Sequence, residues 1–149
     1  PSYDLDAVRV AMAEAMGSTR LPDLGRPGLP AARAQLAGVY GDAIAPAWVD
    51  ATARPTRGAR EAIAALADAG ADGLRPADYG VARLDSLATA LDTAQRTGPA
   101  TIARFDVGLT AGILRFAADL HVGRISPRSI PGNGAVTGCP PTTAINWPA

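Results

Sequence analysis

The chain has 149 residues, which is enough for one domain with a core of its own. Hydrophobic residues make up 48% of it but aromatic residues only 5%, so we expect a helical core in which alanines let backbones approach closely around a few large anchors. Fourteen basic residues, all arginine, balance fourteen acidic ones, and the lack of a net basic surface argues against nucleic-acid binding.

The single cysteine, Cys139, excludes an internal disulfide but does not settle the compartment. The longest apolar stretches fall far short of the roughly 20 residues that a membrane span needs, so no span is expected. The chain begins with Pro1 rather than methionine. We therefore expect that it has been trimmed or processed and that any targeting segment was lost.

Two helices are expected in the first 40 residues. The first runs from Asp4 to Met16, where apolar residues recur at helical spacing until Gly17 ends the pattern. Prolines and glycines between residues 18 and 30 indicate a linker. The second helix runs from about Pro30, a residue suited to a first helical position, to Tyr40. Its inward side is predicted to carry Leu36, Val39 and Tyr40.

The middle of the chain predicts two further helices. An irregular segment over residues 41–55 holds Trp48 as a bulky apolar anchor. A helix then begins after Thr56, a suitable N-cap, and fades through Gly70 and Gly73. A turn over residues 74–79 leads into the next helix, from about Val81 to Ala94, whose inner face carries Leu84, Leu87 and Leu91.

The fifth helix is the longest, from about residue 99 to 122. An apolar stripe is expected on one of its faces, formed by Ile102, Phe105, Leu109, Ile113, Phe116 and Leu120. A helix of this length spans about 35 Å, so we expect it to be the central helix and to end at Gly123. The fold predicted is all-α, a compact bundle of about five helices.

The expected organisation has three parts: an N-terminal helix with its linker over 1–30, a main helical domain over 31–128 and an irregular tail over 129–149. The tail carries no charged residue and shows no periodicity. It is interpreted either as an ordered arm on a neighbour or as a frayed end, and the second is favoured.

No catalytic site, metal cluster or cofactor motif is recognisable. His121, the only histidine, is either a general base or a residue that stabilises the C-terminal end of its helix, which we favour. Cys139 lies among prolines without a nearby base, so an inert thiol is favoured over a nucleophile. No glycine-rich phosphate loop is present.

Three other residues have two interpretations each. Asp106 is expected to be partly buried and paired with an arginine, Arg104 or Arg83, in a structural rather than a catalytic ion pair. Trp48 and Tyr79 either form a ligand platform or fill the helical core from loops. The core is favoured for both.

Several local patterns together resemble a known family. The two most specific are the turn Asp72–Tyr79, with the pattern D-G-L-x-P-A-D-Y, and the stretch Asp119–Arg128, with D-L-H-x-G-R-I-x-P-R. In their order and spacing they resemble the scaffold domain of the large Gram-negative type of L,D-transpeptidase, the murein cross-linking enzymes with a YkuD-type catalytic domain. The resemblance covers roughly Ala32 to Arg128.

The resemblance implies a supporting role in the periplasm. In that family a peptidoglycan-binding insertion and a catalytic domain follow the scaffold, and the nucleophilic cysteine stands in a Ser-His-Gly-Cys-x-Arg context. Cys139 shares only Gly-Cys with it, so the nucleophile is not carried over. The implied partners are the catalytic domain of the same enzyme and peptidoglycan, with docking or binding residues among Trp48, Tyr79, Asp119, His121 and Arg124.

Two alternatives remain open from the sequence. One is a stand-alone module that binds peptidoglycan through the region of Trp48 and Tyr79. The other is a protein–protein interaction domain in which the stripe of Phe105, Leu109 and Phe116 is an exposed groove.

Overall fold

The computed structural model describes residues 1–17 and 30–122, and all regular structure in these ranges is helical. The elements in order are α1 (Leu5–Gly17), α2 (Pro30–Tyr40), α3 (Arg57–Ala67), the 3₁₀ helices η1 (Asp68–Asp72) and η2 (Pro76–Tyr79), α4 (Val81–Thr93) and α5 (Pro99–Val122). The predicted all-α bundle with a long last helix is confirmed. The linker over 18–29, the end of the predicted main domain with Arg124, and the tail over 129–149 with Cys139 lie outside the described residues.

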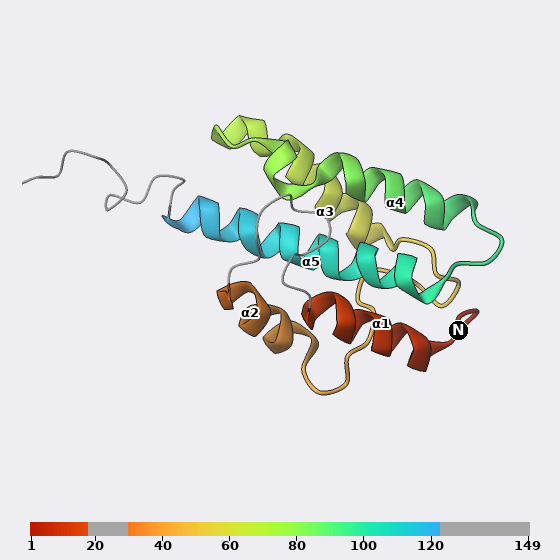
Figure 1. Ribbon diagram of the computed structural model, residues 1–149. Helices are drawn as coiled ribbons and strands as arrows, with labels where there is room; N and C mark the ends of the chain where they lie inside the picture. The colour runs from red at the N-terminus through yellow and green to blue at the C-terminus, as the bar shows by residue number, and fades with distance from the viewer. Residues whose placement is uncertain (18–29, 123–149) are drawn as a thin grey trace, which may run out of the picture.

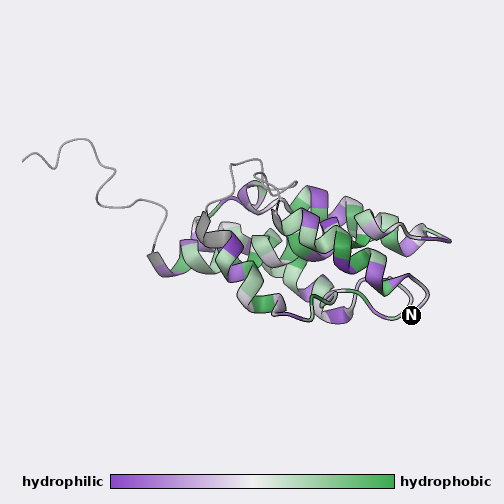
Figure 2. Ribbon diagram, turned by 60° about the horizontal axis from the view of Figure 1, so that its bottom comes forward, coloured by the Kyte–Doolittle hydropathy of each residue, from purple (hydrophilic) through white to green (hydrophobic). Residues whose placement is uncertain are grey.

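Helix α5 is the central helix, as predicted. It runs through the middle of the bundle with α3 and α4 on one side and α1 and α2 on the other (Figure 1). Polar residues lie mostly on the outer faces of the helices and apolar residues toward the middle (Figure 2). The largest fully buried side chains are Val8, Met12, Leu36, Leu66, Tyr79, Leu84, Leu91, Ile102, Phe105, Asp106, Val107 and Leu109.

The middle of α5 is buried on nearly all of its surface rather than along one stripe. From Ile102 to Gly112 only Arg104 is exposed. The small residues Ala103, Gly108, Ala111 and Gly112 make this possible, since they let neighbouring elements approach α5 on the faces that the predicted stripe does not cover. The stripe itself ends before Leu120, which is 50% exposed.

Local signals in the sequence account for the helix boundaries. The Thr56 side chain caps α3 by accepting a hydrogen bond of 3.2 Å from the backbone N–H of Ala59. The two 3₁₀ helices end at Gly73 and Gly80, whose φ angles of 72° and 71° are readily adopted only by glycine. These two turns bring the chain back antiparallel, so that α4 packs beside α3.

On α2, one residue that was predicted to face inward faces outward. Leu36 is fully buried and Tyr40 nearly so, whereas Val39 is 53% exposed. Leu36 and Tyr40 are four residues apart and share one face of α2, but Val39 lies about 100° round the helix from Tyr40. Across the described residues no helix is long and apolar enough to cross a membrane.

Candidate functional site

Polar side chains gather at two places along α5. We call Tyr40, Trp48, Asp106 and Thr110 the inner cluster. We call Tyr79, Arg115, Phe116 and Asp119 the end cluster. The inner cluster lies where the segment between α2 and α3 crosses α5, and the end cluster lies where η2 meets the last turns of α5.

The inner cluster is built around the fully buried carboxylate of Asp106. Its Oδ1 accepts hydrogen bonds from the Tyr40 hydroxyl at 2.7 Å and from the backbone N–H of Ala47 at 3.1 Å. Its Oδ2 accepts one from the backbone N–H of Trp48 at 2.8 Å. Three donors from α2 and the following loop thus converge on one residue of α5.

Side-chain hydrogen bonds link the four residues of the inner cluster in a chain. The Trp48 indole Nε1 donates to Thr110 Oγ1 at 2.8 Å, and Thr110 Oγ1 lies 2.7 Å from the Tyr40 hydroxyl. With the carboxylate ionised, Tyr40 donates its proton to Asp106, and the Thr110 hydroxyl also donates to the Asp106 backbone carbonyl at 3.1 Å. Each bond in such a chain polarises the next, which favours the arrangement as a unit.

Burial and charge shift the ionisation of these groups. Burial raises the pKa of Asp106, while hydrogen bonds from Tyr40, Trp48 and Ala47 lower it by a smaller amount. Burial and the nearby Asp106 carboxylate raise the pKa of Tyr40 far above its ordinary value. The pKa of Tyr3, in the N-terminal segment, is also raised, first by burial and then by the charges of Asp106 and Asp50.

The loop that carries Trp48 is fixed by hydrogen bonds of its own. The backbone N–H of Thr56 donates to the Trp48 carbonyl at 2.9 Å, and that of Asp50 donates to the Arg54 carbonyl at 2.8 Å. The Asp50 side chain accepts from the backbone N–H groups of Thr52 and Arg54. This short loop therefore presents Trp48 to α5 in a fixed position.

The prediction that Asp106 pairs with an arginine was wrong. The hydrogen bonds to its carboxylate come from a hydroxyl and two backbone N–H groups, all neutral, and Arg104 is exposed on another face of α5. Asp106 is also fully rather than partly buried. Its chemistry is that of a structural acceptor that joins α2, the loop and α5.

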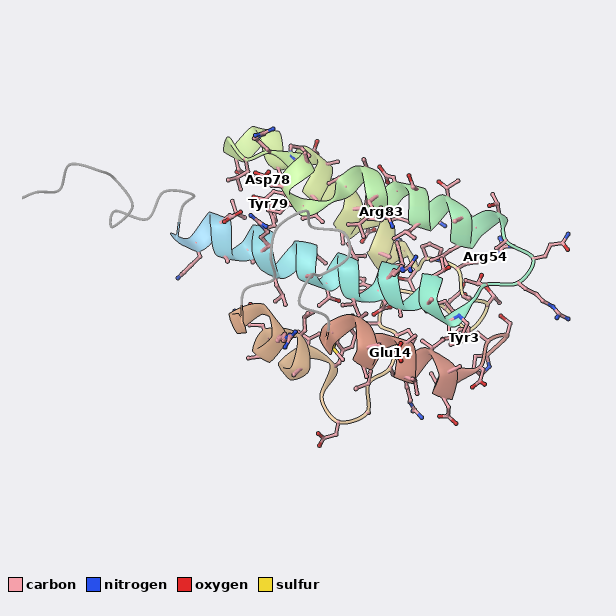
Figure 3. The ribbon with its side chains drawn as sticks, viewed as in Figure 1. Tyr3, Glu14, Arg54, Asp78, Tyr79 and Arg83 are labelled. Atoms are coloured by element: carbon pink, nitrogen blue, oxygen red, sulfur yellow. The ribbon has the colours of Figure 1, made fainter. Side chains whose placement is uncertain are left out.

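The end cluster joins η2 to the last turns of α5. The Tyr79 hydroxyl donates to Asp119 Oδ2 at 2.9 Å, and Arg115 Nε lies 3.8 Å from the same oxygen. The rings of Tyr79 and Phe116 pack edge to face with centroids 5.3 Å apart. Tyr79 itself is fully buried, at the end of the bundle opposite Tyr3 (Figure 3).

A glycine in α5 allows this close approach. A Cβ at Gly112 would lie 3.1 Å from the Tyr79 carbonyl oxygen and 3.3 Å from a methyl carbon of Leu66. A side chain at this position would therefore push η2 away from α5.

The two sequence patterns that carry the family resemblance meet in the end cluster. Tyr79 is the last residue of the D-G-L-x-P-A-D-Y turn, and Asp119 is the first residue of the D-L-H-x-G-R stretch. They are 40 residues apart in sequence and joined by one hydrogen bond. The two patterns are therefore in contact through Tyr79 and Asp119.

The remaining predicted site residues are dispersed. Trp48 and Tyr79 do not form one platform: Trp48 is bonded to Thr110 and Tyr79 to Asp119, about 13 Å further along the helix axis. His121 is exposed on the last turn of α5. Phe105 and Leu109 are fully buried and Phe116 is partly buried, so these three residues pack into the bundle rather than lining an open groove.

Asp106 stands out in the sequence, whereas its partner Tyr40 does not. The available signal was a polar pair spaced i, i+4 within the most apolar part of the long helix, which requires internal partners. Among the described residues no group of three or more His, Cys, Asp or Glu side chains could hold a metal ion.

Comparison with known proteins gives one match. Residues 34–146 match the family model described as Scaffold domain, a stretch that begins within α2 and extends past the end of α5. No curated protein and no solved structure matches the chain.

Proposed function

Because the chain belongs to the Scaffold domain family, we propose that it is the non-catalytic helical scaffold region of a peptidoglycan L,D-transpeptidase. In this role it supports the catalytic domain of the same enzyme while that domain transfers acyl groups between stem peptides and cross-links the cell wall. The proposed location is the periplasm of the bacterial envelope.

The observation that carries the proposal is the hydrogen bond between Tyr79 and Asp119. It unites the two sequence patterns on which the resemblance to L,D-transpeptidases rests. Because the patterns meet at the end of α5, this end is the part of the domain in which the resemblance is concentrated.

The end of α5 has the features of a docking edge. The end cluster fixes the orientation of the last helical turns through Asp119 and Phe116. Beside this fixed part, Leu120 is half exposed and His121 is exposed. An apolar side chain held on a rigid support suits contact with a neighbouring domain, and Arg124 follows two residues after α5 in the sequence.

The inner cluster supports a non-catalytic role. Its carboxylate and both of its hydroxyl groups are engaged with one another and with Trp48. A general base or nucleophile has to reach a substrate atom within about 3 Å. The arrangement of Asp106 is instead suited to rigidity, since it ties three elements together inside the bundle.

Direct binding to a catalytic domain tests the proposal. The chain would be titrated by calorimetry with a separately purified YkuD-type catalytic domain from the same genome, and saturable binding is expected. Leu120→Asp should weaken this binding about 10-fold or more, because it places a charge in an apolar contact. Val10→Asp is the matched control, because Val10 is 61% exposed on α1. Absence of binding, or equal effects of the two variants, would overturn the proposal.

Two further measurements separate the alternatives. Intact-mass analysis after exposure to a carbapenem should show no adduct on Cys139, and a stoichiometric adduct would contradict a non-catalytic role. The second measurement is retention of the chain on purified sacculi. If the chain is retained, Leu120→Asp does not change its retention and the chain does not bind the catalytic domain, a stand-alone peptidoglycan-binding module is favoured.

A further inference from the structure

The buried carboxylate of Asp106 has no cation bonded to it among the described residues. Its three hydrogen-bond donors, the Tyr40 hydroxyl and the backbone N–H groups of Ala47 and Trp48, are all neutral. A buried charge without a counter-ion is costly, so such a carboxyl group takes up a proton more readily than an exposed one. Both charge states of Asp106 therefore have to fit the inner cluster.

With Asp106 ionised, hydrogen bonds are donated toward its carboxylate. The Tyr40 hydroxyl donates to Oδ1 at 2.7 Å, and the Thr110 hydroxyl donates to the Asp106 backbone carbonyl at 3.1 Å. Thr110 Oγ1 accepts one hydrogen bond, from the Trp48 indole at 2.8 Å. A hydroxyl oxygen can accept two, so one acceptor position on Thr110 is unused in this state.

With Asp106 protonated, the same atoms permit the opposite order of donation. A proton on Oδ1 can be donated to the Tyr40 oxygen along the contact of 2.7 Å. The Tyr40 hydroxyl then turns to Thr110 Oγ1, 2.7 Å away, in a contact where either oxygen can be the donor. Thr110 keeps its own donation to the backbone carbonyl and now accepts two hydrogen bonds. Every hydroxyl hydrogen of the chain keeps an acceptor, and no heavy atom has to move.

The other titratable groups around Asp106 do not change charge in acid. Tyr40 from α2 and Tyr3 from the N-terminal segment are neutral there, because the pKa of each is raised above its ordinary value. Asp50, which acts on Tyr3 from the loop, has a lowered pKa because of hydrogen bonds within that loop. No charged side chain from the described residues of α1, α3 or α4 contributes to the pKa shift of Asp106. Asp106 is therefore the group of the inner cluster that gains a proton as the pH falls.

We propose that Asp106, Tyr40 and Thr110 form a proton switch, in which protonation of Asp106 reverses the direction of donation while the three side chains stay in place. The Trp48 indole is coupled to the switch, because it donates to the oxygen whose second acceptor position fills on protonation. The switch keeps α2, the loop and α5 joined in both charge states, so acid does not open the bundle at this joint. The proposal does not depend on the function proposed above.

Nuclear magnetic resonance on the full chain tests the switch. The signals of the Asp106 carboxyl carbon and of the Trp48 indole N–H are followed as the pH is lowered. Both should change with one midpoint, which lies above 3.8 because burial raises the pKa of Asp106. In Asp106→Asn the Trp48 signal should lose this transition. Asp50→Asn, the matched control in the exposed loop, should leave it in place.

Variants of Thr110 show whether the reversal passes through this hydroxyl. Thr110→Val removes the acceptor that the Tyr40 proton needs only when Asp106 is protonated, so the midpoint should fall by about half a pH unit. The longer contact of 3.0 Å from the Tyr40 hydroxyl to the Asp106 backbone carbonyl replaces part of the lost bond. Thr110→Ser keeps the hydroxyl and should keep the midpoint of the original protein.

Three results would overturn the proposal. The first is a Trp48 signal that does not follow Asp106 in the original protein, a result that depends on no destabilised variant. The second is a Trp48 transition that persists at the same midpoint in Asp106→Asn, because another group would then be its source. The third is a midpoint in Thr110→Val that equals or exceeds the midpoint in Thr110→Ser.

Discussion

Replacing Thr110 by valine should destabilise the bundle although the two side chains have nearly the same shape. Thr110 Oγ1 lies at the centre of the inner cluster, 2.8 Å from the Trp48 indole nitrogen and 2.7 Å from the Tyr40 hydroxyl. Valine keeps the volume but removes both of these hydrogen bonds and a third, of 3.1 Å, from Thr110 Oγ1 to the Asp106 backbone carbonyl. The change therefore isolates the polar contribution of this position from its packing.

The expected loss follows from the groups left behind. The indole N–H of Trp48 loses its acceptor in a partly buried position, and the Tyr40 hydroxyl loses one partner but keeps Asp106. An unsatisfied buried group costs about 1–3 kcal/mol and a lost hydrogen bond about 1 kcal/mol. The free energy of unfolding should fall by about 2–3 kcal/mol, which corresponds to a drop of about 5–10 °C in Tm for a chain of this size.

Urea denaturation followed by circular dichroism at 222 nm measures this loss, with Thr110→Ser as the control that keeps the hydroxyl. The serine variant should lose less than the valine variant. Combining Thr110→Val with Trp48→Phe should cost less than the sum of the single changes, because the second removes a donor already unpaired. Two results would refute the hydrogen-bond chain. One is a free energy of unfolding of the valine variant within about 0.5 kcal/mol of that of the original protein. The other is a double variant whose loss equals the sum of the losses of the two single variants.

Three other predictions concern single positions. Gly112→Ala should lower the free energy of unfolding by about 1–3 kcal/mol, because the new Cβ would crowd the Tyr79 carbonyl. Gly38→Ala, on the open surface of α2, should raise it by about 0.5–1 kcal/mol. Thermal melts in which both variants shift Tm in the same direction would contradict the packing at Gly112. Tyr79→Phe should cost about 1 kcal/mol in the same melts by removing the hydrogen bond to Asp119, and an unchanged Tm would show that this bond contributes nothing. Burial raises the folded-state pKa of Asp106 above its ordinary value of 3.8, so the folded protein binds a proton at this residue more readily than the unfolded chain does. The free energy of unfolding, measured relative to that of Asp106→Asn, should therefore increase as the pH is lowered through the raised pKa. A relative decrease in urea titrations would show that hydrogen bonding outweighs burial.

The helices could be predicted closely because their signals are local. Thr56 as an N-cap, Gly17 as a stop and the apolar spacing along residues 99–122 each act within a few residues of the boundary that they set. The same local patterns predicted a central α5, since only that helix is long enough to contact all the others.

The burial of α5 and the partner of Asp106 could not be predicted in this way. Whether Ala103 and Gly112 face solvent or a neighbouring helix depends on elements distant in sequence, so periodicity shows only the strongest face. Asp106 and Tyr40 are separated by 66 residues, and the choice of a neutral donor rather than an arginine depends on how α2 is placed. The end cluster was partly predictable, because Tyr79 and Asp119 both belong to recognisable patterns.

The position of α5 also bears on how the domain responds to mechanical load. Each of the helices α1 to α4, together with η2, contacts this one helix along its length. A force applied at its C-terminal end would therefore load all of these contacts in shear at the same time, rather than peeling away one helix after another. Pulling from that end should rupture the bundle in a single high-force event, so α5 would resist force transmitted from any domain attached to its C-terminal end.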